Sequence, residues 1–179
     1  VKRLYPLLFI SVLIYWGCLD PLNIFDFNDE ETVDEETGSS VNLWGVDYSI
    51  ENTTVLNLGG QGLTGSIPPE IGSLTNLRHL YLYNNQLTGS IPPEIGNLTN
   101  LTELISYNNQ LSGSIPPEIG NLNNLTNLRL YDNQLTGIIP DEICNQGDSS
   151  PSLSNNQLCP PYPSCIEDDV GEQDTSGCD

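Results

Sequence analysis

The sequence feature that most constrains the fold is a repeat with a period of 24 residues. Residues 74–97 read LTNLRHLYLYNNQLTGSIPPEIGN, and this stretch returns almost unchanged at 98–121 and more loosely at 122–145. A degenerate copy precedes it at 50–73, and half a copy follows at 150–158. A fixed period in this range predicts an architecture of stacked repeats.

The apolar residues of each copy cannot form a core by themselves. Leu80 and Leu82 are two positions apart, so a short strand there points both side chains to one side. Burial requires each coil to stack its leucines on those of the next coil, which needs at least three coils. The apolar set of the second copy is Leu74, Leu77, Leu80, Leu82, Leu87, Ile91 and Ile95.

Three kinds of turn residue recur with the same period. An asparagine follows each strand, at Asn85, Asn109 and Asn133, and we expect it to bond backbone groups of neighbouring coils. Glycines recur where the chain bends tightly. Proline pairs suit the start of a short helical turn on the far side. The glycines are Gly65, Gly89, Gly113 and Gly137, and the pairs begin at Pro68, Pro92 and Pro116.

The consensus LxxLxLxxNxLxGxIPxxIG resembles the leucine-rich repeat, in the variant of extracellular plant receptor kinases and polygalacturonase-inhibiting proteins. The resemblance covers residues 50–158. It implies an α/β solenoid of right-handed coils with a parallel sheet on the concave face, a second short strand near LTGSIP and one-turn helices near PPEIG on the convex side. Ser106 departs from the pattern, because it stands where other copies have leucine; the loss of a core leucine costs roughly 2–4 kcal/mol.

The first 18 residues, VKRLYPLLFISVLIYWGC, have the pattern of an export signal. Lys2 and Arg3 precede an apolar run that is short for a membrane span. The final Gly-Cys resembles a bacterial lipoprotein signal, which makes Cys18 a candidate for lipidation; a simple cleaved signal, an uncleaved anchor and a misassigned start are the alternatives. We therefore expect an exported protein, secreted or held at the cell surface, with membrane contact only through the signal or lipid.

Two further segments precede the repeats. Residues 19–40 are rich in acids and lack bases, which predicts an extended tether; a calcium loop is the weaker alternative, because the acids lack its regular alternation. Residues 41–49, VNLWGVDYS, resemble the amino-terminal cap of plant-type repeats, with Trp44 over the end of the core. The four repeats then span 50–145, and residues 146–179 form a cysteine-containing cap and acidic tail.

Cysteine usage supports export. Besides Cys18, the chain has four cysteines, all near the carboxyl end: Cys144, Cys159, Cys165 and Cys178. Four cysteines allow three pairings, and the absence of a Cys-x-x-Cys pair favours disulfides over zinc. The segment from Leu158 to Cys165 resembles the end piece of plant-type repeats, and this resemblance implies Cys159–Cys165 with Cys144–Cys178.

The sequence predicts no enzyme, cofactor or metal site. The single histidine, His79, excludes a histidine-based metal cluster or catalytic triad, and no phosphate-binding loop or nucleophile elbow occurs. The recurring Glu70, Glu94, Glu118 and Glu142 lie where a helical turn begins, so we interpret them as a solvated stripe. A net charge of −20 with only four Lys and Arg residues argues against nucleic-acid partners.

Residues that alternate with the core leucines must face outward from the sheet, where equivalent positions stack about 4.8 Å apart. Three stacked tyrosines there form an exposed aromatic patch, of the residue types that dominate binding hot spots. The alternative is that these tyrosines only stabilise the sheet through cross-strand pairs. The candidate binding residues are His79, Tyr81, Tyr83, Glu103, Ile105, Tyr107, Arg129, Tyr131 and Asp132.

Three functions fit this pattern. The first is a monomeric recognition module that binds a protein or a carbohydrate through the concave face. The second is a structural or adhesive surface protein, although about four coils make a short spacer. The third is an ice- or crystal-surface binder that uses two regular polar ladders: Thr75, Thr99 and Asn123, with Thr88, Ser112 and Thr136.

Overall fold

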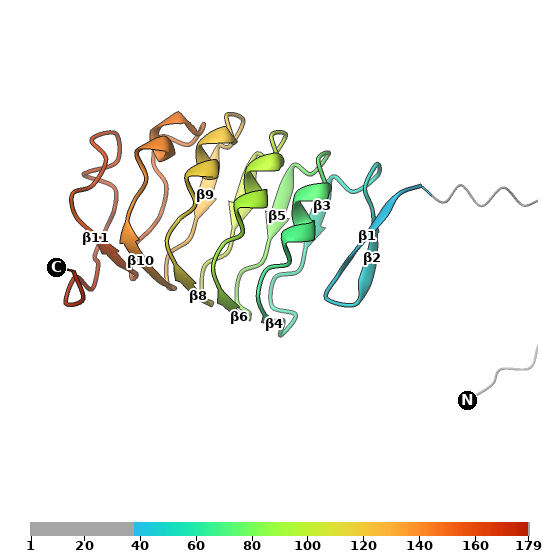
Figure 1. Cartoon of the computed structure of the whole chain (residues 1–179), viewed down its shortest axis with the longest axis horizontal. Coiled ribbons are helices and arrows are strands. Elements are labelled where there is room, and N and C mark those ends of the chain that lie inside the picture. The colour runs from blue at the N-terminus through green and yellow to red at the C-terminus, as the bar shows by residue number, and fades with distance from the viewer. Residues whose placement is uncertain (1–37, 179) are drawn as a thin grey trace, which may run out of the picture. The chain divides into compact units, whose positions relative to one another are not determined.

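The computed structural model describes residues 38–178. The predicted export signal, the Cys18 lipidation site and the tether as far as residue 37 lie outside the described residues. The described chain is a stack of coils joined by parallel strands (Figure 1). Four coils have two strands and a helical turn, and the last contributes only β11. The α/β leucine-rich repeat solenoid predicted from the period is therefore confirmed, with helical turns of the 3-10 type.

Two parallel sheets run through the stack. The first sheet has the order β3-β5-β7-β9, and the second has the order β4-β6-β8-β10-β11. The strands of the first sheet are β3 (Val55–Asn57), β5 (His79–Tyr81), β7 (Glu103–Ile105) and β9 (Asn127–Arg129). Those of the second are β4 (Thr64–Gly65), β6 (Gln86–Gly89), β8 (Gln110–Gly113), β10 (Gln134–Ile138) and β11 (Gln157–Cys159).

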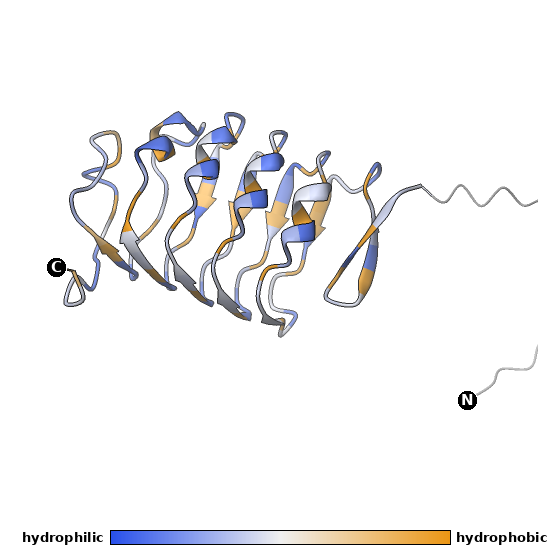
Figure 2. Cartoon of the chain, viewed as in Figure 1, coloured by the Kyte–Doolittle hydropathy of each residue, from blue (hydrophilic) through white to orange (hydrophobic). Residues whose placement is uncertain are grey.

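The core consists of leucine and isoleucine columns that run along the stack. Leu80 pairs in register with Leu104, which pairs with Leu128, so equivalent side chains lie directly above one another. All three are buried. In Figure 2 hydrophobic residues recur at the same point of each successive coil, between hydrophilic ones. The 24-residue spacing thus produces one continuous core that no coil forms alone.

Asparagines at the bend after each first-sheet strand form an asparagine ladder: Asn85, Asn109, Asn133 and Asn156. The Nδ2 of Asn109 donates to the carbonyl oxygens of Leu82 (2.9 Å) and Ser106 (3.2 Å). Its Oδ1 accepts from the amide of Leu87 at 3.1 Å. The predicted bonding between neighbouring coils is confirmed, and it satisfies backbone groups that the bend leaves without partners.

A short 3-10 turn closes each coil opposite the first sheet. A proline in extended conformation precedes each turn, and in the first three turns a second proline stands at its start. The turns stack closely, because a Cβ added at Gly72 would lie 2.6 Å from the carbonyl oxygen of Glu94. They are η1 (Pro69–Ser73), η2 (Pro93–Asn97), η3 (Pro117–Asn121) and η4 (Asp141–Asn145).

An antiparallel hairpin of β1 (Ser40–Leu43) and β2 (Val46–Ser49) covers the first coil. Leu43 is fully buried and joins the core, whereas Trp44 is only partly buried. Trp44 occupies the hairpin turn with a φ of 49° and packs against the core from there. Leu43, rather than Trp44 alone, therefore closes this end of the core.

Two disulfides in the carboxyl-terminal cap confirm the predicted oxidised cysteines, but the pairing expected from the resemblance is wrong. The bonds are Cys144–Cys165 and Cys159–Cys178. The reason is the stacking of the turns. Cys144 takes the position of Gly120 one coil later, and Cys165 takes the position of Glu142. Because Gly120 packs against Glu142, the same stacking brings the two cysteines together.

The last coil ends on a glutamine. Gln173 Nε2 donates to the carbonyl oxygens of Leu153 and Val170, both at 2.9 Å. Its Oε1 accepts from the amide of Leu158 at 3.2 Å. A ladder asparagine makes the same set of bonds. Gln173 therefore replaces that asparagine in the tail, after the repeat sequence has ended.

Candidate binding surface on the first sheet

Tyr83, Tyr107 and Tyr131 form a tyrosine ladder two residues beyond the first-sheet strands. Backbone bonds between coils hold their spacing: the amide of Asn84 donates to the Tyr107 carbonyl at 3.0 Å. The rings of Tyr83 and Tyr107 stack with centroids 5.3 Å apart, and those of Tyr107 and Tyr131 stack at 4.6 Å. The tyrosine column therefore packs as a continuous stack, as the register predicts.

The stacking determines which part of each ring a ligand can reach. Both faces of Tyr107 are covered, one by Tyr83 and the other by Tyr131. The far side of Tyr83 lies over Gly59, where any Cβ would overlap the ring. Tyr83 and Tyr107 therefore present ring edges and hydroxyl groups outward.

A second row lies beside the ladder, where Tyr81, Ile105 and Arg129 are in register. The Tyr81 hydroxyl donates to Glu103 Oε2 at 2.9 Å. Partial burial, followed by this bond to a carboxylate, raises the pKa of Tyr81. Burial likewise raises the pKa of Tyr131, with Tyr107 adding to the effect and Arg129 opposing it.

Glu103 is held between two neighbours. While Oε2 accepts the Tyr81 bond, Oε1 lies 3.8 Å from Nδ1 of His79. That nitrogen is buried and makes no hydrogen bond within the described chain. His79 is thus half-buried against Glu103.

Arg129 is the exposed cation of this surface. Of the four basic residues only Arg78 and Arg129 lie in the described chain, and neither has a carboxylate within 4.0 Å there. Asp132 does not reach it, since its Oδ1 accepts from Nδ2 of Asn155 at 2.6 Å. In a chain of net charge −20, an arginine without a carboxylate partner is available for an acidic group of a ligand.

These side chains surround a shallow hollow of about 430 Å³, the binding hollow. Seven of the nine predicted residues line it; His79 and Asp132 do not. Asn57 also lines the hollow and was not among the candidates. Its pairing with Tyr81 in the sheet register was the signal that could have identified it. The lining residues are Asn57, Tyr81, Tyr83, Glu103, Ile105, Tyr107, Arg129 and Tyr131.

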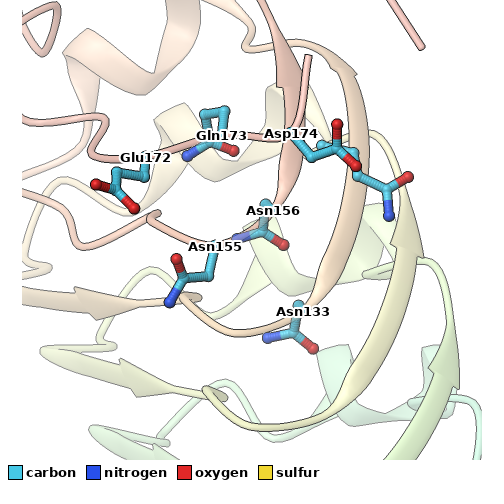
Figure 3. A pocket seen from close by; sticks show the side chains of 7 residues that line it. Asn133, Asn155, Asn156, Glu172, Gln173 and Asp174 are labelled. Atoms are coloured by element: carbon cyan, nitrogen blue, oxygen red, sulfur yellow. The ribbon is translucent and has the colours of Figure 1, made fainter. Parts of the chain in front are cut away.

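A second hollow, of about 350 Å³, lies where the tail returns over the last coil (Figure 3). Asn133, Asn155 and Asn156 line it from the coils, and Glu172, Gln173 and Asp174 from the tail. The amides of Asn133, Asn156 and Gln173 are already engaged in the ladder bonds. We therefore attribute this hollow to the packing of the cap on the last coil.

Within residues 38–178 no group of three His, Cys, Asp or Glu side chains is arranged to hold a metal ion. In the same residues no helix is both long and apolar enough to cross a membrane.

Comparison with known proteins places this architecture in a family. A model of two-copy leucine-rich repeats matches residues 75–116, and a single-repeat model matches 52–74 and 124–146. No curated protein sequence matches the chain. Among solved structures, the complex of BIR3 and SERK2 from Arabidopsis thaliana is 30% identical over 84% of this chain and 82% of that one, with a TM-score of 0.60. The chain belongs to the leucine-rich repeat family, in its plant-type form.

Two other similar structures are considerably longer than this chain. The ectodomain of the Arabidopsis thaliana receptor kinase GASSHO1/SCHENGEN3, in complex with CASPARIAN STRIP INTEGRITY FACTOR 2, is 40% identical with a TM-score of 0.57. The match covers 59% of this chain but 13% of that ectodomain. A plant ice-binding protein is 42% identical over 59% of this chain and 34% of its own, with a TM-score of 0.55.

Proposed function

We propose that this chain is a non-enzymatic recognition domain that binds a protein or peptide through the binding hollow. The observation that carries the proposal is the combination of the tyrosine ladder with Arg129, an arginine without a carboxylate partner in the described chain. Tyrosine and arginine supply most hot-spot energy in protein interfaces. The similar GASSHO1/SCHENGEN3 ectodomain was solved in complex with CASPARIAN STRIP INTEGRITY FACTOR 2, and the similar plant peptide hormone receptor RGFR1 in complex with RGF2, which supports a ligand of this class.

The ring geometry favours a polypeptide over a carbohydrate partner. A sugar ring stacks on an aromatic face, and the faces of Tyr107 are covered by its neighbours. Ring edges can instead contact the side chains of a peptide, and the hydroxyls can hydrogen-bond its backbone amides, if the peptide lies extended along the coils. Arg129 would receive an acidic group of that peptide.

Selection from a phage-displayed random peptide library tests this function. Peptides enriched on the full chain should contain an acidic residue and bind the Arg129→Gln variant about tenfold more weakly, a loss of about 1.4 kcal/mol. Arg78→Gln is the matched control, because Arg78 is also exposed but does not line the hollow. Triple Tyr→Phe substitution at 83, 107 and 131 keeps the stacked rings and removes the hydroxyls, so it should also weaken binding. Equal binding by all variants, or enrichment on a glycan array alone, would contradict the proposal.

We further propose that the protein acts outside the cytoplasm as a monomer. The two disulfides support an oxidising compartment, and the signal-like residues 1–18 supply the route. Radiolabelled palmitate incorporation that disappears in Cys18→Ser would establish the lipoprotein form. Release of unlabelled protein into the medium would establish the secreted form.

A second candidate function is binding to ice. It is supported by the likeness to the plant ice-binding protein and by the regular polar ladders of the repeat. Thermal hysteresis of the purified chain, the gap between its melting and freezing temperatures, tests this function directly. Peptide binding and ice binding would use different surfaces, so each can be tested without the other.

A further inference from the structure

The outward face of the second sheet carries no charged side chain on strands β6, β8 and β10. In each strand two polar residues point out on either side of a buried leucine: Leu87, Leu111 or Leu135. The outward polar residues are Gln86 and Thr88, Gln110 and Ser112, and Gln134 and Thr136; in β10 the apolar Ile138, which is 60% exposed, follows on the same side. This neutral surface stands out in a chain with 24 acidic residues.

The register makes this surface a regular grid. Thr88 pairs with Gln110 on the next strand, Ser112 pairs with Gln134, and Thr136 pairs with Gln157. Neighbouring strands are about 4.8 Å apart, and successive outward residues of one strand are about 6.7 Å apart. Hydroxyl and amide groups therefore repeat in two directions on a backbone that hydrogen bonds hold rigid.

The other polar ladder considered for ice binding lacks this arrangement. Thr75, Thr99 and Asn123 lie in the turns between the helical segments and the first sheet, outside both sheets. The backbone carbonyls of Thr75 and Thr99 accept from Asn100 and Asn124 on the next coils, so this region is a connection between coils. Its residues lie on no strand, whereas those of the second sheet are held in register by strand pairing.

We propose that the second-sheet face is the surface through which the chain binds ice, an assignment that rests on the ice-binding candidate above. A charged group holds its hydration water strongly, so removing that water costs far more free energy than it does for a neutral group that finds a new hydrogen bond. Neutral hydroxyls and amides instead exchange bulk water for lattice water with little net loss. Because interstrand hydrogen bonds already hold the backbone of the grid, only its side-chain rotamers must be ordered on binding.

The test measures ice affinity by partition of the fluorescently labelled full chain into a slowly growing ice hemisphere, together with thermal hysteresis. The test variant Thr88→Lys/Gln110→Lys places two charges at one cross-strand pair of the grid. The control variant Thr75→Lys/Thr99→Lys places the same charges on the other ladder. Circular dichroism and urea unfolding confirm that both variants fold.

We expect the wild-type chain to partition into ice, the test variant to lose at least tenfold in ice affinity, and the control variant to remain within twofold of wild type. Arg129→Gln should also behave as wild type, which separates this surface from the binding hollow. Wild-type partition with an unaffected test variant would overturn the face assignment and leave ice binding intact. Absence of wild-type partition would overturn both, and retention on crystalline cellulose without hysteresis would assign the face to a polysaccharide lattice instead.

Discussion

At the scale of single residues, Ser106 is the clearest defect of the repeat. It is 1% exposed, and its hydroxyl has no hydrogen-bond partner among residues 38–178, at the position where Leu82 and Leu130 fill the core. We expect Ser106→Leu to raise the free energy of unfolding by about 1–2 kcal/mol, because it adds apolar contact and removes a buried polar group without a partner. Urea denaturation measures the change, and Leu130→Ser is the converse control, with an expected loss of about 2–4 kcal/mol. A destabilised Ser106→Leu would mean that the core has closed around the serine.

The asparagine ladder permits a matched comparison of adjacent residues. Asn109→Ala removes the bonds to Leu82, Ser106 and Leu87, and should lower the free energy of unfolding by about 2–4 kcal/mol because buried backbone groups lose their partners. Asn108 is exposed and within the described residues its side chain bonds only that of Asn84, so Asn108→Gly should change stability by about a few tenths of a kcal/mol. Glycine is the appropriate replacement there, since the φ of Asn108 is 53°. Similar losses in both variants would contradict the structural role of the ladder.

The raised pKa values of Tyr81 and Tyr131 predict a stability change at alkaline pH. Both phenols hold their protons more tightly in the folded chain, so their contribution is complete below the unfolded pKa of 10.0 and is lost as pH rises through the folded value. Absorbance titration at the phenolate band should show a late-titrating component that decreases in Tyr81→Phe. Absence of a late-titrating component would show that the burial of these phenols and the bond from Tyr81 to Glu103 do not hold in solution.

At the scale of the elements, the sequence predicted the positions of strand residues better than the contacts between their side chains. The spacing of Leu80 and Leu82 was sufficient to place the first sheet, and its register then aligned Tyr81, Ile105 and Arg129. What spacing could not reveal is that the tyrosine rings cover one another, because ring orientation depends on χ angles and on the room that Gly59 leaves. Gln173 was also missed, since a longer amide in a non-repeating tail gives no periodic signal.

The disulfide pairing shows which sequence signal is more reliable. Family resemblance pointed to Cys159–Cys165. The repeat alignment instead places Cys144 at the position of Gly120 and Cys165 at that of Glu142, two positions that are in contact, and this predicts the observed bond. Peptide mapping without reduction should recover Cys144–Cys165 and Cys159–Cys178. Loss of the first bond in Cys144→Ser/Cys165→Ser should lower stability by about 2–4 kcal/mol, because the unfolded chain regains the freedom of the loop between them. Recovery of a Cys159–Cys165 peptide would contradict the stacking argument.

At the scale of the whole molecule, each coil contacts only its neighbours, so the chain should tolerate removal of one complete period. Deletion of residues 98–121 joins Asn97 to Leu122, which preserves the local sequence and brings the coils of Tyr83 and Tyr131 into contact. We expect this variant to unfold in a single transition, with a urea m-value lower by roughly one sixth, in proportion to the surface removed. Deletion of residues 98–109, half a period, joins Asn97 to Gln110 and puts strand residues of one coil against turn residues of the next. That variant should show no cooperative transition, and if it folded as well as the full-period deletion, the fold would not depend on the period from which it was predicted.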